Sequence, residues 1–277
     1  MIVDDYSRFS WVKFLRFKNK SFSKFRIFVT LIERKTGNSI GRIHSDHGGE
    51  FDNKEFEEFC NTLGIEYNFS APRTPQQNGV AERKNKTLIE AAHSMLNEYS
   101  LPKYFWAEAV NTTCYVLNRV NIRLNLNKTS YELLKGKTPN LSHLHVFGCK
   151  CYVHNNGKNI LGKFDAKSDE GIFLGYSIVG HAYRVFNRRT LLVEESVHVS
   201  FDESFPSRPK EDDVLVPVVN DLILNIELHV EECERFRKFN RGTLLVEESV
   251  HASFDKSLPS RPKEDDVLVS VVNDRSL

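Results

Sequence analysis

The chain has 277 residues, 40% of them hydrophobic, which is enough for one substantial domain and a smaller one. Its 38 basic and 37 acidic residues exclude an overall basic field, so any contact with nucleic acid must come from local patches. Five scattered cysteines do not form a disulfide framework, and an acidic N-terminus without a long apolar run argues against a signal peptide and a membrane span. We therefore expect an intracellular protein that is neither secreted nor membrane-bound.

The first 120 residues predict alternating strands and helices. Aromatic and β-branched residues favour strands, and phenylalanines at helical spacing favour a core helix ending at Gly37. Asn53 is the expected N-cap of a second helix that ends at Gly64. The expected order is a hairpin (2–6 and 10–15), a helix (20–35), a strand ending at Ser45, a helix (54–63), a strand (65–69) and helices over 80–99 and 103–121. This is a mixed α/β pattern.

Two carboxylates in this half are candidates for metal chemistry. Asp46 follows the strand directly and precedes two glycines, and Glu82 lies in the first turn of the helix over 80–99, with 35 residues between them. Hard divalent cations such as Mg²⁺ take carboxylate oxygens, and paired ions can hold both oxygens of a phosphoryl transfer. The alternative is structural: Asp before glycine is common in turns, and Glu at a helix start complements the helix dipole.

A basic cluster follows Glu82 along the same helix. It consists of Arg83, Lys84 and Lys86. Lys86 lies four residues after Glu82 and shares its helix face, so it could meet a DNA phosphate beside the carboxylate. The alternative is a basic face that only contacts water.

Residues 121–142 are polar and predict a boundary between domains. Short strand-like runs then follow at close spacing, with Gly and Asn turns, and predict a small β-barrel. These runs are 145–147, 151–153, 170–176, 183–186 and 192–194.

Four possible zinc ligands lie near the start of this region: His143, His145, Cys149 and Cys151. Structural zinc sites usually separate paired cysteines by two or more residues. Here Cys149 and Cys151 would lie on the same face of one strand, with little chain to wrap a tetrahedral ion. The spacing therefore argues against zinc.

The C-terminal region contains a repeat. Residues 187–221 recur as residues 240–274 with five differences. A solenoid would repeat the unit along the chain, whereas this unit occurs twice, so a recent duplication explains it better. Polar stretches such as PSRPKEDD predict disorder.

Six motifs, taken in order, resemble the integrase of copia-type LTR retrotransposon Pol polyproteins over roughly residues 1–205. They are VDDYSRFSWVKFL, SDHGGEF, TPQQNGVAER, GCKCYVH, DEGIFLGYS and YRVFNRRTLLVEESVHVSFDE. The resemblance implies an α/β fold: a ribonuclease H-like core lacking its first, central strand, then an SH3-like β-barrel and a disordered tail. The domains expected from it are 1–120 (core), 121–143 (linker), 144–205 (SH3-like module) and 206–277 (tail).

The resemblance also implies a function. Asp46 and Glu82 look like the second and third acids of a D,D(35)E triad, and would be catalytic ligands of Mg²⁺ or Mn²⁺. Complete relatives would process DNA 3′ ends and join element ends to target DNA, with Arg83, Lys84 and Lys86 on DNA. The implied partners are DNA and, in the intact family, further copies of the chain, without a small-molecule substrate. The implied location is the nucleus or the cytoplasm.

One feature departs from the family pattern. In the resemblance the first Asp lies on the strand before the N-terminal hairpin, and Asp4 and Asp5 match the following strand, whose acids are not ligands. We therefore expect no catalysis by these residues alone and two unpaired strand edges in the core. The alternatives are a nucleic-acid-binding remnant without catalysis and a non-functional relic. A generic ribonuclease H fits less well, because the motifs extend beyond the nuclease core.

Overall fold

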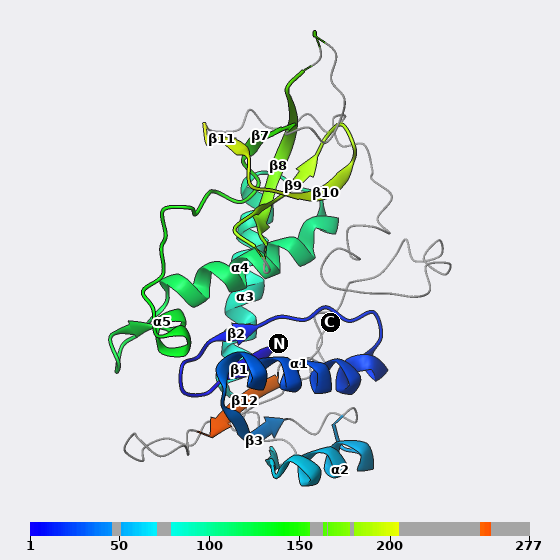
Figure 1. Ribbon diagram of the computed structural model, residues 1–277, viewed down its shortest axis with the longest axis vertical. Helices are drawn as coiled ribbons and strands as arrows, with labels where there is room; N and C mark the ends of the chain where they lie inside the picture. The colour runs from blue at the N-terminus through cyan, green and yellow to red at the C-terminus, as the bar shows by residue number, and fades with distance from the viewer. Residues whose placement is uncertain are drawn as a thin grey trace. The chain divides into compact units, whose positions relative to one another are not determined.

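The computed structural model in Figure 1 describes residues 1–45, 51–70, 79–155, 163–164, 166–177, 180–204 and 250–255. The chain divides into two compact units, each discontinuous in sequence. Unit 1 comprises Met1–Thr87, Leu117–Pro139 and Leu244–Leu277, and unit 2 comprises Leu88–Val116 and Asn140–Thr243. None of the described helices is both long enough and apolar enough to cross a bilayer.

Unit 1 is built on a mixed five-stranded sheet in the order β2-β1-β12-β3-β4. Its strands are β1 (Ile2–Asp4), β2 (Ser10–Trp11), β3 (Ser39–Ser45), β4 (Glu66–Phe69) and β12 (Val250–Asp255). The pairs β1–β2 and β12–β3 are antiparallel, whereas β1–β12 and β3–β4 are parallel. The N-terminal hairpin and the mixed α/β fold are therefore as predicted.

The central position of this sheet differs from the prediction. It was expected to be empty, with unpaired edges on β1 and β3, but β12 lies between these strands and pairs with both (Figure 1). β12 belongs to the tail for which disorder was predicted, and the rest of that tail lies outside the described residues. Backbone groups of buried strands need partners, and a period-two segment from far along the chain supplies them here.

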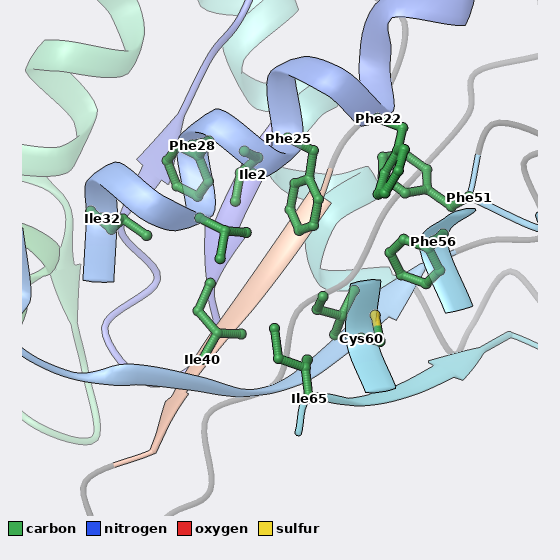
Figure 2. Close-up of a cluster of buried hydrophobic side chains, with 12 residues drawn as sticks. Ile2, Phe22, Phe25, Phe28, Ile32, Ile40, Phe51, Phe56, Cys60 and Ile65 are labelled. Carbon is green, nitrogen blue, oxygen red and sulfur yellow. The ribbon is translucent and has the colours of Figure 1, made fainter. Parts of the chain in front are cut away.

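Two helices pack on the sheet of unit 1, and phenylalanine side chains are buried in the core between them. The helices are α1 (Ser21–Thr36) and α2 (Lys54–Leu63). Phe51 meets Phe25 and Phe56 edge-on, at ring-centroid distances of 5.5 and 5.4 Å, an arrangement that favours aromatic pairs beyond simple burial. In Figure 2 the side chains of α1 point toward those of β3 and α2. The core consists of Ile2, Phe22, Phe25, Phe28, Val29, Ile32, Ile40, Ile43, Phe51, Phe56, Cys60 and Ile65.

The ends of both helices follow from local sequence. Gly37 and Gly64 adopt the left-handed conformation that ends each helix, at φ 71° and 68°, where a side chain would be strained. Asn53 caps α2 by accepting a hydrogen bond from the Phe56 N–H at 2.9 Å. The helix ends at Gly37 and Gly64 and the cap at Asn53 are thus as predicted.

A bulge in β3 explains an irregular burial pattern. Ile40 and Ile43 both belong to the core, although residues three apart in a regular strand lie on opposite faces. The register with β12 shifts between Ser253 and Phe254, so that Gly41 has no partner there. One extra residue in a strand reverses the alternation, so both isoleucines reach the same core.

A side chain covers the outer edge of this sheet. Asn118 lies on α4 (Trp106–Val120) and exchanges two hydrogen bonds with the backbone of Ser10 on β2: it accepts from the N–H at 2.9 Å and donates to the C=O at 2.8 Å. An amide group that donates and accepts in this way replaces a neighbouring strand. Unit 1 also contains the strands β5 (Ile122–Arg123) and β6 (Lys128–Thr129) and the helix α5 (Ser130–Lys135). Thr129 and Glu132 cap the N-terminus of α5.

Unit 2 contains an antiparallel sheet in the order β10-β9-β8-β7-β11. The strands are β7 (Lys150–His154), β8 (Ser168–Tyr176), β9 (Tyr183–Asn187), β10 (Leu192–Ser196) and β11 (Val199–Asp202). Four of the predicted strands are present. The predicted strand at 145–147 is wrong, because the His145 N–H donates to the Tyr176 hydroxyl (2.9 Å) and the chain turns at Gly148, φ 87°. β11 was missed.

This sheet packs against helical residues of unit 2, which come from the second part of α3 (Gly79–Glu98), the 3-10 turn Lys103–Phe105 and the first part of α4. Arg184 on β9 forms a buried bidentate pair with Glu108 on α4, at 3.0 and 2.6 Å. The Thr112 hydroxyl donates to the Leu174 carbonyl at 2.7 Å. The helical residues 88–116 therefore form one compact unit with the barrel strands, and the domain bounds read from the sequence stay a prediction.

Candidate functional site

The candidate site lies where the parallel strands β3 and β4 end. Ser45 pairs with Phe69 at the end of both strands, and the Ser70 N–H donates to the Ser45 carbonyl at 2.9 Å. Ser45 and Ser70 are buried. In α/β sheets, functional side chains commonly gather at the carboxyl ends of parallel strands. Sequence reasoning did not single out Ser70, because its partner is set by strand pairing rather than by a local motif.

Asp46 follows Ser45 directly and lies outside the described residues, together with residues 47–50. The chain is fixed on both sides of this stretch. Ser45 is 1% exposed at the end of β3, and Phe51 is 1% exposed in the aromatic core. Asp46 therefore follows directly on a buried strand end.

Glu82 lies in the first turn of α3, the helix that follows β4 along the chain. Its side chain is half-buried, between the buried residues Ala81 and Asn85 of the same helix. A carboxylate in this position is stabilised by the partial positive charge of the helix N-terminus. The intervening residues 71–78 lie outside the described part of the chain.

The basic residues of α3 differ in exposure. Arg83 and Lys86 are exposed, and Lys84 is half-buried. The guanidinium of Arg83 lies over Gly79, where a β-carbon would be 3.9 Å from its central carbon. Lys86, four residues after Glu82, lies on the same side of the helix as that carboxylate. Arg83 and Lys86 are therefore accessible to a polyanion.

The N-terminal acids have structural partners. Asp4 ends β1, is buried, and accepts hydrogen bonds from the Ser7 N–H at 2.8 Å and from the Ser7 hydroxyl. Asp5 pairs with Arg8. These bonds shape the turn between β1 and β2, as short polar side chains commonly do.

The four residues considered for zinc have other contacts. His143 bonds the Tyr115 hydroxyl at 2.9 Å, and His145 bonds Glu203 at 2.7 Å and stacks on Phe201. Cys149 and Cys151 are buried in the barrel core, and burial raises the pKa of each thiol to about 12, which disfavours the thiolate that binds metal. Among the residues that the structure describes, which do not include Asp46, no three His, Cys, Asp or Glu side chains are grouped to hold a metal ion.

β12 supplies no carboxylate where β3 ends. Its only acid is Asp255, which pairs with Ser39 at the opposite end of β3. Toward Ser45 the paired residue is His251, opposite His44. β12 therefore adds no acid at this end of β3, and the candidate carboxylates remain Asp46, which follows β3 along the chain, and Glu82, in the first turn of α3.

Comparison with known families gives two matches along the chain. Residues 1–75 match the integrase core domain, and residues 149–214 match the retroviral polymerase SH3-like domain. The first match includes Asp46 and ends before Glu82. The second includes all five barrel strands, β7 to β11, and continues beyond the last of the described barrel residues.

Two curated relatives cover most of this chain. The retrovirus-related Pol polyprotein from transposon TNT 1-94 of Nicotiana tabacum is 42% identical over 202 residues, which is 73% of this chain and 15% of that protein. The corresponding polyprotein from transposon RE1 of Arabidopsis thaliana is 35% identical over 207 residues, 74% of this chain and 14% of that protein. The chain thus spans about one seventh of the length of these relatives.

Two solved integrase structures align with this chain at low similarity. The HTLV-2 integrase catalytic core domain in complex with magnesium aligns over 48% of this chain and 80% of that one, with 22% identity and a TM-score of 0.35. The catalytic core domain of BIV integrase aligns similarly, with a TM-score of 0.37.

Proposed function

We propose a function from the premise that this chain belongs to the copia-type retrotransposon Pol polyproteins, of which it carries an integrase core segment and the SH3-like segment. The chain is an integrase fragment that binds DNA and a divalent cation at the carboxyl edge of β3 and β4. The observation that carries this proposal is the shared end of the two parallel strands, with Asp46 after one and the helix of Glu82 after the other.

Asp46 and Glu82 are the proposed ligands of Mg²⁺ or Mn²⁺. Both are carboxylates, which suit hard cations, and each is attached to a regular element, a strand end or a helix start. A bound ion would supply charge neutralisation for phosphoryl transfer on DNA. The protein's own contribution is to hold two oxygen ligands at the edge of a packed sheet.

The basic residues of α3 are the proposed DNA contacts. Arg83 and Lys86 are exposed on the helix that carries Glu82, and Lys84 lies between them. Phosphate contacts of this kind position DNA without reading its sequence. The DNA would be element ends and target DNA, and the chain would act with further copies of itself, as the family relationship implies.

We further propose that residues 1–277 do not catalyse integration by themselves. The family resemblance assigns a third carboxylate to the central strand, and β12 has no acid near the end of β3 that Asp46 follows. Two carboxylates bind a cation weakly and leave the ions of a two-metal site incompletely held.

The test is a DNA nicking and strand-transfer assay with the full chain in Mg²⁺ or Mn²⁺. We expect DNA binding but no product, and we expect Lys86→Ala to reduce the slope of log affinity against log salt by about 0.9. A metal-dependent product that disappears in Asp46→Asn would contradict the proposed inactivity while supporting the site. Binding with the same salt slope in wild type and Lys86→Ala would contradict the proposed DNA contact.

A second candidate is nucleic-acid binding without any metal. The exposure of Arg83 and Lys86 favours it, since these groups can meet phosphate whether or not a cation is bound. In that case chelators and Glu82→Gln would leave the affinity for DNA unchanged.

A further inference from the structure

We propose that the space between β1 and β3 is a strand-binding slot, and that its occupant is the chain's own segment 250–255 from the second copy of the internal repeat. This segment acts as a donor strand that completes the sheet of unit 1. This role of β12 in the fold of unit 1 does not depend on whether the chain binds metal or DNA.

The register of β12 matches the alternation of the surrounding core. Val250, Ala252 and Phe254 are in register with Ile2, Ile43 and Ile40, respectively. All three isoleucines belong to the hydrophobic core of unit 1. The polar residues of the segment, His251, Ser253 and Asp255, occupy the other positions. A one-residue slip would exchange the two sets, so this sequence specifies its own register.

Backbone hydrogen bonding also requires a strand between β1 and β3. β1 is buried along its whole length, and Ile43 in the middle of β3 is fully buried. Without a strand between them, the N–H and C=O groups on the facing edges of β1 and β3 would lie unpaired in a largely buried region. Two strands that run in opposite directions accept a third in either direction, with one parallel and one antiparallel ladder in each case. β12 pairs with β1 in parallel and with β3 antiparallel.

The first copy of the repeat shows what kind of strand this sequence forms. Residues 197–202 read VHVSFD and residues 250–255 read VHASFD. In the first copy, β11 pairs antiparallel with β7, and its apolar residues Val199 and Phe201 are in register with Val153 and Cys151 of the barrel core. The same period-two pattern is thus used as an outer strand of one sheet and as the central strand of another. The slot accepts an extended segment with alternating apolar and polar residues.

Disulfide trapping tests the identity of the occupant. His44 and His251 are an antiparallel pair, and such pairs bring Cα atoms to about 4.5–5.5 Å, within the range of a disulfide. The full chain is prepared as His44→Cys with His251→Cys, in a Cys233→Ser background that removes the cysteine lying outside the described residues. The matched control is His44→Cys with His198→Cys, since His198 is the equivalent position in the first copy.

We expect oxidation to give an intramolecular disulfide with residue 251 and none with residue 198, read as faster migration on a non-reducing gel. A link to residue 198 would show that the first copy fills the slot, and a linked dimer would show that a second copy of the chain does. Absence of any link would mean that the slot is not filled by this segment. Each of these three outcomes overturns the proposal.

A second measurement does not depend on cysteines. Proline has no N–H and is not tolerated in a central strand, so Ala252→Pro should release β12. Amide protons of β1 and β3 should then lose hydrogen-exchange protection, whereas Val199→Pro in the first copy should leave that protection unchanged. Equal protection of β1 and β3 in wild type and Ala252→Pro would contradict the proposal.

Discussion

At the residue scale, the sheet of unit 1 is completed at one edge by the Asn118 side chain, which binds backbone groups that a further strand would otherwise bind. The Asn118 amide satisfies both the backbone donor and the backbone acceptor of Ser10 on β2, an edge strand of the sheet. Asn118 is 2% exposed, so water does not compete for these bonds. No sequence pattern announced this contact, because 108 residues separate the partners and an Asn within a helix has no characteristic signal.

Asn118→Ala should lower the free energy of unfolding by about 1–3 kcal/mol, because it removes two buried hydrogen bonds. Urea denaturation of the full chain measures the change. Asn121→Ala is the control, since Asn121 is exposed just beyond the end of α4. Equal stability of the two variants would contradict the role assigned to Asn118.

A carboxylate in unit 2 should make stability depend on pH. Asp169 accepts two hydrogen bonds from Arg189, each at 2.7 Å, and one from Asn187 at 3.0 Å, and these bonds lower the pKa of the Asp169 carboxyl. A lowered folded-state pKa means that the stabilisation is present above the unfolded-state pKa of about 3.9 and is lost as the pH falls through the folded-state value.

Asp169→Asn should therefore destabilise the protein by about 1 kcal/mol at pH 7, and the difference from wild type should shrink as the pH is lowered from 5 toward 2. Urea denaturation at a series of pH values measures this. Asp52→Asn, at an exposed carboxylate, serves as the control. A difference that grows in acid would contradict the assignment.

At the element scale, close contacts hold β8 and β9 against α4 in unit 2. Gly175 on β8 has φ 139°, and a β-carbon there would lie 2.0 Å from the Thr112 hydroxyl oxygen. Arg184 is bound by Glu108 and also by Glu195 at 2.9 Å, so a buried charge has two partners. Glycine is required at position 175 by both its backbone conformation and its neighbour.

Gly175→Ala should lower the free energy of unfolding by roughly 2–4 kcal/mol, from backbone strain and overpacking against Thr112. Gly180→Ala is a matched control, because a β-carbon there would meet nothing within 4 Å. Urea denaturation curves of both variants measure the change in the free energy of unfolding. An unchanged stability in Gly175→Ala would show that β8 does not pack on α4 in this way.

The elements that the sequence predicted well are those with local signals. Helix α1 follows from phenylalanines at helical spacing and from Gly37, and α2 from Asn53 and Gly64. Short strands carry weaker signals. The run 145–147 contains Val146 and Phe147, but the backbone N–H of His145 binds a side chain instead of a strand. β11 is only four residues long, so its assignment depends on its pairing with β7. Such pairings are set by distant residues.

At the scale of the whole molecule, the sequence predicted an integrase-type core and an SH3-like barrel, and both family matches agree. The edge that Asp46 follows could be foreseen, since a polar residue after an apolar strand marks a strand end. The occupant of the central sheet position could not be foreseen, because Ala252 of β12 lies 209 positions after its partner Ile43 on β3. The role of β12 as a donor strand follows only from its pairing with β1 and β3 in the folded sheet.

In the proposed function, Asp46 and Glu82 together bind a divalent cation. The measurement is thermal unfolding of the full chain by circular dichroism, with and without Mg²⁺, for wild type, Asp46→Asn and Glu82→Gln. At about ten times its Kd, Mg²⁺ should stabilise the wild type by about 1.4 kcal/mol, which raises the Tm by about 3–6 °C, and each variant should lose most of this shift. The same shift in all three proteins, or none in the wild type, would contradict the claim.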